Sequence, residues 1–190
     1  MPSRSKKRTN PRKIPLAKAA INQEEVIAEV STGNLYHAWL LVLPTLVDID
    51  GMTKEKAVSL WEAVNDYASD PSFTGAHLQA QMSRAEKLMG YPVPHQNVSF
   101  RGITTRGELE ALKRKLKDNA IHAALCIIWL GIEKTQEFSE GSLRHLFLNA
   151  NLTLAEVQAG YTTYEQLADE MENRGYALRE STDEMELSPV

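Results

Sequence analysis

The chain is short of cysteine and of long apolar runs. Its one cysteine, Cys126, lies in the run AALCIIWLGI. It can form neither an internal disulfide nor a multi-cysteine metal site, and we expect a buried small hydrophobe. The longest apolar run, LLVLPTLV, is interrupted by proline and falls well below the roughly 18 to 20 residues of a membrane span. The basic N-terminus lacks the apolar core of a signal peptide. We therefore expect no membrane contact and a cytoplasmic location.

Catalytic motifs are also missing. The sequence has no Walker loop, no GxGxxG after a strand, no GxSxG elbow, no HExxH, and no cysteine–histidine pair arranged for catalysis. Adjacent acids such as Glu24 and Glu25 are typical of a solvated helix start. We expect that the protein is not an enzyme and that it uses no cofactor and no metal.

Charge is distributed unevenly along the chain. The formal net charge is −4, yet residues 1–18 hold seven of the 21 basic residues and none of the 25 acidic ones. The remainder carries 14 basic against 25 acidic residues, a net of −11. An acidic body repels phosphate, so contact with nucleic acid is expected from the basic tail and from one local basic run. The alternative is a solvated, solubilising tail. The residues predicted to bind a partner or nucleic acid are Arg4, Lys6, Lys7, Arg8, Arg12, Lys13, Lys113, Arg114, Lys115 and Lys117.

Helix signals predict an all-α fold. One helix is expected over 22–47, kinked or broken near its end by Pro44. Another is expected over 105–132, opened by a capping box of Thr105 and Glu108. A short extended piece is predicted at 98–100, and no other strand is expected. Further helices are predicted over 76–89 and from starts at Thr53, Ser139, Thr153 and Thr162, with stops at Gly90 and Gly175, each followed by a tyrosine.

Two parts of the chain resemble each other. NLYHAWLLVL from Asn34 lies over NAIHAALCII from Asn119, an offset of 85 residues, and after a one-residue shift Thr53 and Ser139 coincide as helix starts. We infer two diverged copies of a three-helix unit packed as one helical bundle. The expected organisation is a flexible basic tail (1–20), repeat 1 (21–94), a linker (95–104), repeat 2 (105–178) and a flexible acidic tail (179–190).

The duplication singles out four residues as a candidate inter-repeat site. His37 and His122 recur in both copies, and if the long helices meet about a pseudo-twofold axis, their imidazoles could bind an anion or a metal. Neither histidine has a carboxylate or a histidine three or four residues later, which disfavours a metal, and a structural histidine is the alternative. Trp39 and Trp129 are each particular to one copy. Core or inter-repeat packing is expected for them, with a partner-binding face as the alternative.

The segment KKRTNPRKIPLAKAAI, together with HAWLLVLPTLVD and TKEKAVSLWEAVND, resembles small helical proteins of unknown function from bacteriophages and mobile elements of gut Firmicutes. Those proteins begin with a basic leader containing Asn-Pro-Arg and run for about one repeat. The resemblance covers roughly the first 95 residues and implies origin more than activity. It carries no functional residues over to this chain.

Three functions remain open at this point. The leading hypothesis is a non-enzymatic, phage-like protein that binds a host protein and inhibits an immune system such as a CRISPR effector, with the acidic body mimicking a phosphate surface. The second is a nucleic-acid-associated protein that grips phosphate through the basic tail while its helical body dimerises or recruits. The third is a binding protein for a nucleotide signal, held in the groove between the repeats.

Overall fold

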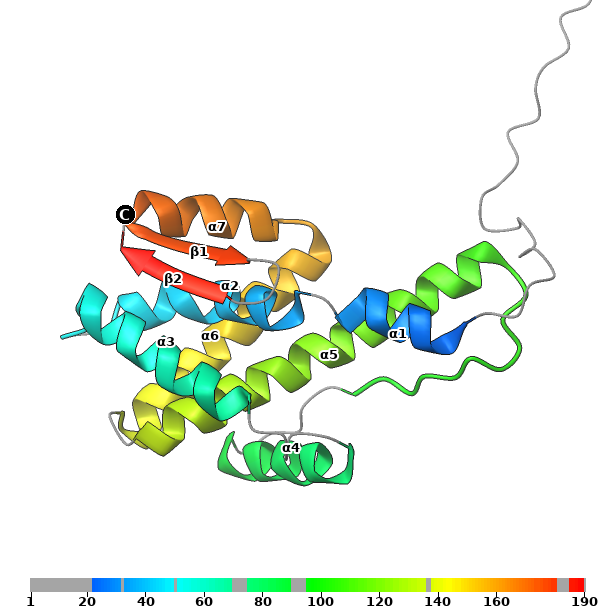
Figure 1. The fold of residues 1–190 in the computed structure, drawn as a ribbon, viewed down its shortest axis with the longest axis horizontal. Helices are drawn as coiled ribbons and strands as arrows, with labels where there is room; N and C mark the ends of the chain where they lie inside the picture. The colour runs from blue at the N-terminus through cyan, green and yellow to red at the C-terminus, as the bar shows by residue number, and fades with distance from the viewer. Residues whose placement is uncertain are drawn as a thin grey trace, which may run out of the picture. The chain divides into compact units, whose positions relative to one another are not determined.

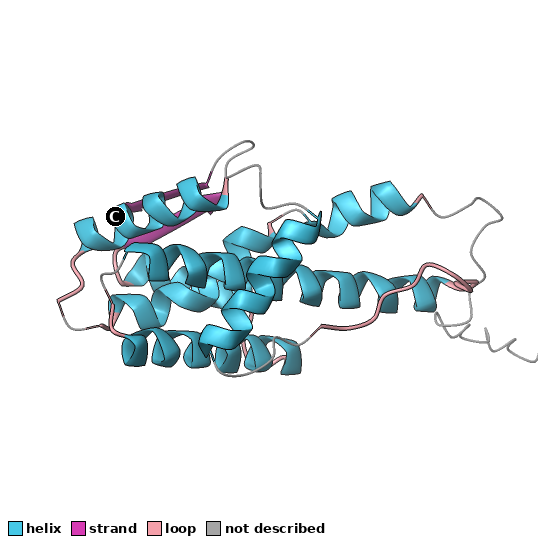
Figure 2. Ribbon diagram, turned by 90° about the horizontal axis from the view of Figure 1, so that it is seen from below, coloured by secondary structure: helices cyan, strands magenta, loops and turns pink. Residues whose placement is uncertain are grey.

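The computed structural model describes residues 22–31, 33–49, 51–69, 75–89, 95–135, 138–180 and 185–189. In these ranges the chain forms seven helices and one β-hairpin, shown in Figure 1 and, by type, in Figure 2. The all-α class is confirmed. The backbone divides into two compact units: unit 1 comprises 1–32 and 95–120, and unit 2 comprises 33–94 and 121–190. The predicted basic tail, 1–20, lies outside the described residues.

Unit 1 contains α1 (Gln23–Ser31) and the first part of α5 (Arg106–Thr135). The predicted capping box of α5 is confirmed. Glu108 Oε2 accepts the Thr105 N–H at 2.9 Å, and the Glu108 N–H donates to Thr105 Oγ1 at 3.3 Å. These bonds satisfy N–H groups that a helix start leaves without partners. The N–H groups of Thr104 and Thr105 hold the pKa of the Glu108 carboxyl below its ordinary value.

The segment that leads into α5 is held by an amide side chain. Asn119 Oδ1 accepts the Gln96 N–H and Asn119 Nδ2 donates to the Gln96 carbonyl, both at 2.9 Å. Gln96 Nε2 also donates to Asp118 Oδ2 at 3.1 Å. The extended piece predicted at 98–100 is not a strand.

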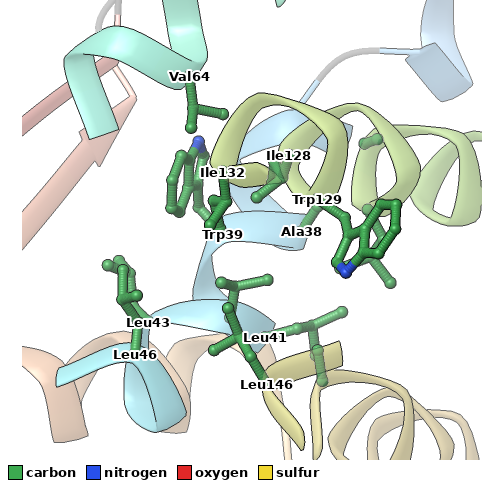
Figure 3. Packing of buried hydrophobic residues seen from close by; sticks show 14 of the residues in the cluster. Ala38, Trp39, Leu41, Leu43, Leu46, Val64, Ile128, Trp129, Ile132 and Leu146 are labelled. Atoms are coloured by element: carbon green, nitrogen blue, oxygen red, sulfur yellow. The ribbon is translucent and has the colours of Figure 1, made fainter. Parts of the chain in front are cut away.

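Unit 2 is built around α2 (Asn34–Val47). Residues 38–43 and Leu46 are all buried, so α2 is apolar on every side, as expected of a helix at the centre of a core. Helices α3, α6 and α7 and strand β1 contact it. Figure 3 shows this packing, with Trp39 of α2 beside Val64 and Ile132, and Leu41, Leu43 and Leu46 on the side of Leu146.

The surrounding helices begin close to where the sequence predicts. Thr53 Oγ1 accepts the Lys56 N–H at the start of α3 (Lys54–Ala68), and Ser139 Oγ accepts the Ser142 N–H at the start of α6 (Glu140–Ala159). The helix predicted over 76–89 is α4 (Gly75–Met89). The last helix, α7 (Tyr164–Asn173), opens on a capping box of Thr163 and Gln166, one residue after the predicted start.

Two helix predictions are wrong. The helix expected over 22–47 is two helices, α1 and α2, because Gly33 has a φ of 73°, a left-handed conformation that suits glycine and ends a helix. The start predicted at Thr153 does not exist, since α6 runs through it. Thr153 Oγ1 donates to the Asn149 carbonyl at 3.0 Å. A threonine inside a helix can bond four residues back instead of capping a new helix.

The expectation of no strand near the C-terminal end is also wrong. Strands β1 (Tyr176–Glu180) and β2 (Met185–Pro189) pair antiparallel, with Leu178 opposite Leu187. Residues 179–190, expected as a flexible acidic tail, thus contribute to both strands. The predicted stop at Gly175 (φ 84°) is confirmed, and β1 returns along α7 (Figure 1). Burial of Leu178 and Leu187 holds the hairpin in the core of unit 2.

Arg174 joins the C-terminal ends of α7 and α2. Its Nη1 donates to the Pro44 carbonyl and to Asp48 Oδ1, both at 3.1 Å, while Nε lies 3.3 Å from Glu170 Oε1. The last turn of a helix has carbonyls without N–H partners, and cations are favourable there. The guanidinium therefore meets the last turns of two helices at once.

Candidate functional site

The two tryptophans of the candidate inter-repeat site are core residues. Trp39 is fully buried, and its indole N–H donates to Asn65 Oδ1 at 3.1 Å. Trp129 is also buried and packs edge-on against Phe147, with ring centroids 6.0 Å apart. In Figure 3 the two indoles lie apart, with Ala38, Ile128 and Ile132 between them. Neither indole is available to a partner at the surface.

The two histidines also make structural contacts. The His37 ring lies over the Tyr164 ring, with centroids 4.1 Å apart and planes inclined by 34°, so it joins α2 to α7. His122 is buried on α5. Among the residues that the structure describes, no group of three histidines, cysteines or carboxylates is placed to hold a metal ion.

The local basic run is partly neutralised. Lys113 Nζ lies 2.7 and 2.6 Å from the two carboxylate oxygens of Glu29 on α1. Arg114 and Lys115 are exposed, whereas Lys117 is half-buried. The described parts of unit 1 carry six basic and six acidic residues. The tail residues Arg4, Lys6, Lys7, Arg8, Arg12 and Lys13 lie outside the described residues.

A shallow hollow of about 380 Å³ lies between α3 and α5. Its floor is tight: Gly131 faces Val64 and Tyr67, and Lys134 Nζ stands 4.8 Å from the centroid of the Tyr67 ring. None of the four residues of the predicted inter-repeat site lines it. The lining residues are Ala63, Asp66, Tyr67, Gly131, Lys134 and Thr135.

An acidic face runs along the outside of α7. Glu165, Asp169 and Glu172 are exposed, while Leu167 and Met171 face the core. Positions i, i+4 and i+7 share one side of a helix, so these three carboxylates form one stripe, which we call the acidic stripe. The net charge of the sequence predicts an acidic body, but no sequence pattern singles out this helix.

An apolar ridge crosses the outside of α6 and was missed by sequence reasoning. Leu148 and Leu152 are 51% and 56% exposed, although the opposite side of α6 already packs into the core. Tyr161, just past the end of the helix, is 84% exposed. The signal was present as apolar residues at i and i+4, but the false helix start at Thr153 divided α6 and concealed it.

Cys126 offers no reactive thiol. It is buried, and burial, with a smaller effect of Glu86, raises the pKa of its thiol to about 12. Because the thiolate is the reactive form, we expect no labelling of the native protein by iodoacetamide at pH 8 and prompt labelling in denaturant. Mass spectrometry of the alkylated chain measures both. Stoichiometric labelling of the folded protein would contradict this placement.

The stretch 23–47 is long and apolar enough, by length and composition alone, to cross a membrane. Half of its most apolar 18-residue segment is buried in the structure. A buried core helix passes the same test, so this stretch is weak evidence for a membrane span. No family model, curated protein or solved structure matches the chain significantly.

Proposed function

We propose that this protein is a non-enzymatic binding protein that occupies the basic, nucleic-acid-binding surface of a host protein, such as a CRISPR effector. The observation that carries the proposal is the acidic stripe of Glu165, Asp169 and Glu172, all exposed on α7. A surface that binds phosphate does so with lysine and arginine. Such a surface also attracts carboxylates that a helix holds in a row, because they carry the same sign of charge as phosphate.

The spacing of charge on the stripe and the charge of unit 2 support this mimicry. Residues 165–172 span about 10.5 Å of helix at 1.5 Å per residue, so the three carboxylates follow one another at about 5 Å on average, a wider spacing than that of phosphates. A DNA strand carries one phosphate per roughly 3.4 Å of helix axis. Unit 2 as a whole has 8 basic against 19 acidic residues, a net of −11, which adds long-range attraction to a basic partner.

The second candidate is nucleic-acid contact through the basic tail. Its support is the charge of residues 1–18, seven basic residues with no acid. The run at 113–117 adds less than the sequence implies, because Lys113 is paired with Glu29. We therefore rank this function below binding to a protein.

The test is competition for a nucleic-acid site. A panel of purified CRISPR effectors is mixed with labelled target DNA, and DNA binding and cleavage are measured as the protein is added. We expect at least one effector to lose DNA binding as the protein is added. We also expect the affinity of the protein for that effector to fall as salt is raised, because dissolved ions screen attraction between exposed charges.

Matched variants separate the stripe from overall charge. The pair Asp169→Asn with Glu172→Gln removes two of the three charges of the stripe, and the pair Glu62→Gln with Asp66→Asn makes the same change of net charge on α3, where both acids are exposed. We expect about a tenfold or greater loss of inhibition from the first pair and less than twofold from the second. Equal effects of the two pairs, or no inhibition of any effector, would count against the proposal.

We also propose that the chain arose by duplication of a three-helix unit. Two observations support it. The helix starts at Thr53 and Ser139 lie 86 residues apart, and the matched Asn34 and Asn119 lie 85 residues apart. Related sequences in which the two segments vary without any shared pattern would contradict the duplication.

A further inference from the structure

The outer ridge of α6 combines apolar and charged residues in a symmetric order. Arg144, Leu148, Leu152 and Glu156 are spaced by four residues and are all exposed. Residues at i and i+4 form one continuous ridge on a helix. The ridge therefore carries a positive charge at one end, two leucines in the middle and a negative charge at the other end, over about 18 Å of helix.

That order is self-complementary. If two copies of the ridge lie side by side in opposite directions about a twofold axis, Leu148 meets Leu152 of the second copy and Arg144 meets Glu156. The packing of i, i+4 ridges of two helices is the commonest class, with axes crossing at about −50°. Gly141, Ala155 and Ala159 are the other small exposed residues of this helix, and small residues let two helices approach closely.

An exposed aromatic residue follows the end of α6. Gly160 has a φ of 78°, its N–H donates to the Val157 carbonyl at 3.1 Å, and the Tyr161 N–H donates to the Glu156 carbonyl at 2.9 Å. These two bonds form a Schellman motif, which fixes the backbone at the end of a helix. Tyr161 is thus presented on a fixed backbone, and exposed aromatic side chains of this kind are frequent anchors of interfaces.

We infer that the outer ridge of α6 binds a second copy of this chain and forms a twofold dimer through Arg144, Leu148, Leu152 and Glu156. The ridge is complementary in charge to a second copy of itself, and this favours a second copy of the chain as its partner. In the single chain Arg144 pairs with Glu140, one turn away on the same helix, at 2.7 Å, and such exposed pairs contribute little. The ridge is small, so the dimer is of the weak class, with a dissociation constant on the order of 10 μM. The inference does not depend on the acidic stripe of α7.

The experiment is sedimentation equilibrium of the full chain between 1 and 200 μM, with charge-reversal variants. Arg144→Glu places like charges together at both ends of the twofold interface, and Glu156→Arg does the same with the opposite sign. We expect each single variant to raise the dissociation constant at least tenfold. The double variant Arg144→Glu with Glu156→Arg restores the dimer, because both pairs are reversed together.

Mixing gives a second, sharper test. An equimolar mixture of the Arg144→Glu chain and the Glu156→Arg chain forms a heterodimer, since each acid then meets an arginine at both ends. Leu152→Asp abolishes the dimer in every combination, and circular dichroism of this exposed-site variant remains that of the parent. A parent chain that is monomeric at 200 μM would overturn the inference. So would a dimer indifferent to Leu152→Asp, or single variants that do not associate when mixed.

Discussion

Replacing Trp39 with alanine will lower the free energy of unfolding by about 3–5 kcal/mol, the usual cost of removing a large aromatic side chain from a core. Trp39 is fully buried, and Val64 and Ile132 lie beside it (Figure 3). Unfolding free energies of small domains are themselves only about 5–15 kcal/mol. The variant should therefore unfold at a much lower urea concentration, with an unchanged slope of free energy against urea if the folded state is otherwise intact.

The hydrogen bond of Trp39 can be separated from its volume. Trp39→Phe keeps an aromatic ring but leaves Asn65 Oδ1 without the indole N–H. In the part of the chain that the structure describes, the indole N–H of Trp129 has no hydrogen-bond partner, so Trp129→Phe is the matched control. We expect Trp39→Phe to cost about 1 kcal/mol more than the control. An equal loss in both variants would show that the Asn65 contact contributes nothing.

Helix starts were predictable from sequence because they depend on neighbouring residues. Thr53, Ser139 and the Thr105–Glu108 box each cap the helix that the sequence assigns to them. The same pattern predicts a helix start at Thr153 that does not exist. There the hydroxyl donates to a carbonyl four residues back, inside a continuous helix. A capping pattern does not say whether the preceding helix has ended, and that depends on the burial of residues on both sides of it.

The hairpin was not predictable on the same grounds. The two strands, 176–180 and 185–189, have five residues each and contain acidic residues. Their local sequence does not predict that they pair. What stabilises the hairpin is packing, because Leu178 and Leu187 are buried. The sequence contains the two leucines but not the surface that receives them.

The candidate sites divide along the same line. Trp39, Trp129 and His122 are buried, and His37 is half-buried against Tyr164. The sequence pattern that singled out these four residues therefore marked packing positions. Exposure is a property of the whole fold, and it is exposure that distinguishes Leu148 and Leu152 from the buried leucines of α6. The sequence alone could not separate these two sets.

Close packing between α3 and α5 makes Gly131 the second sensitive position. Replacing a glycine inside a helix with alanine ordinarily stabilises a protein by roughly 0.5–1 kcal/mol. At Gly131 an added Cβ would lie 3.0 and 3.1 Å from the two methyl carbons of Val64 and 3.3 Å from Cδ1 of Tyr67. Forcing a methyl group into a filled core costs about 1–3 kcal/mol, so Gly131→Ala should destabilise the protein in urea or thermal unfolding.

Gly141 and Val64 provide the controls for this expectation. A Cβ at Gly141 of α6 would meet nothing closer than Ser139 Oγ at 3.9 Å, so Gly141→Ala should be neutral or stabilising by up to about 1 kcal/mol. If the clash with Val64 is the cause, Val64→Ala will cost less in the Gly131→Ala background than in the parent, because the new methyl group fills the space it leaves. A coupling free energy of about 1 kcal/mol between the two substitutions is expected. Strict additivity, or stabilisation by Gly131→Ala alone, would mean that α3 and α5 lie farther apart than these distances place them.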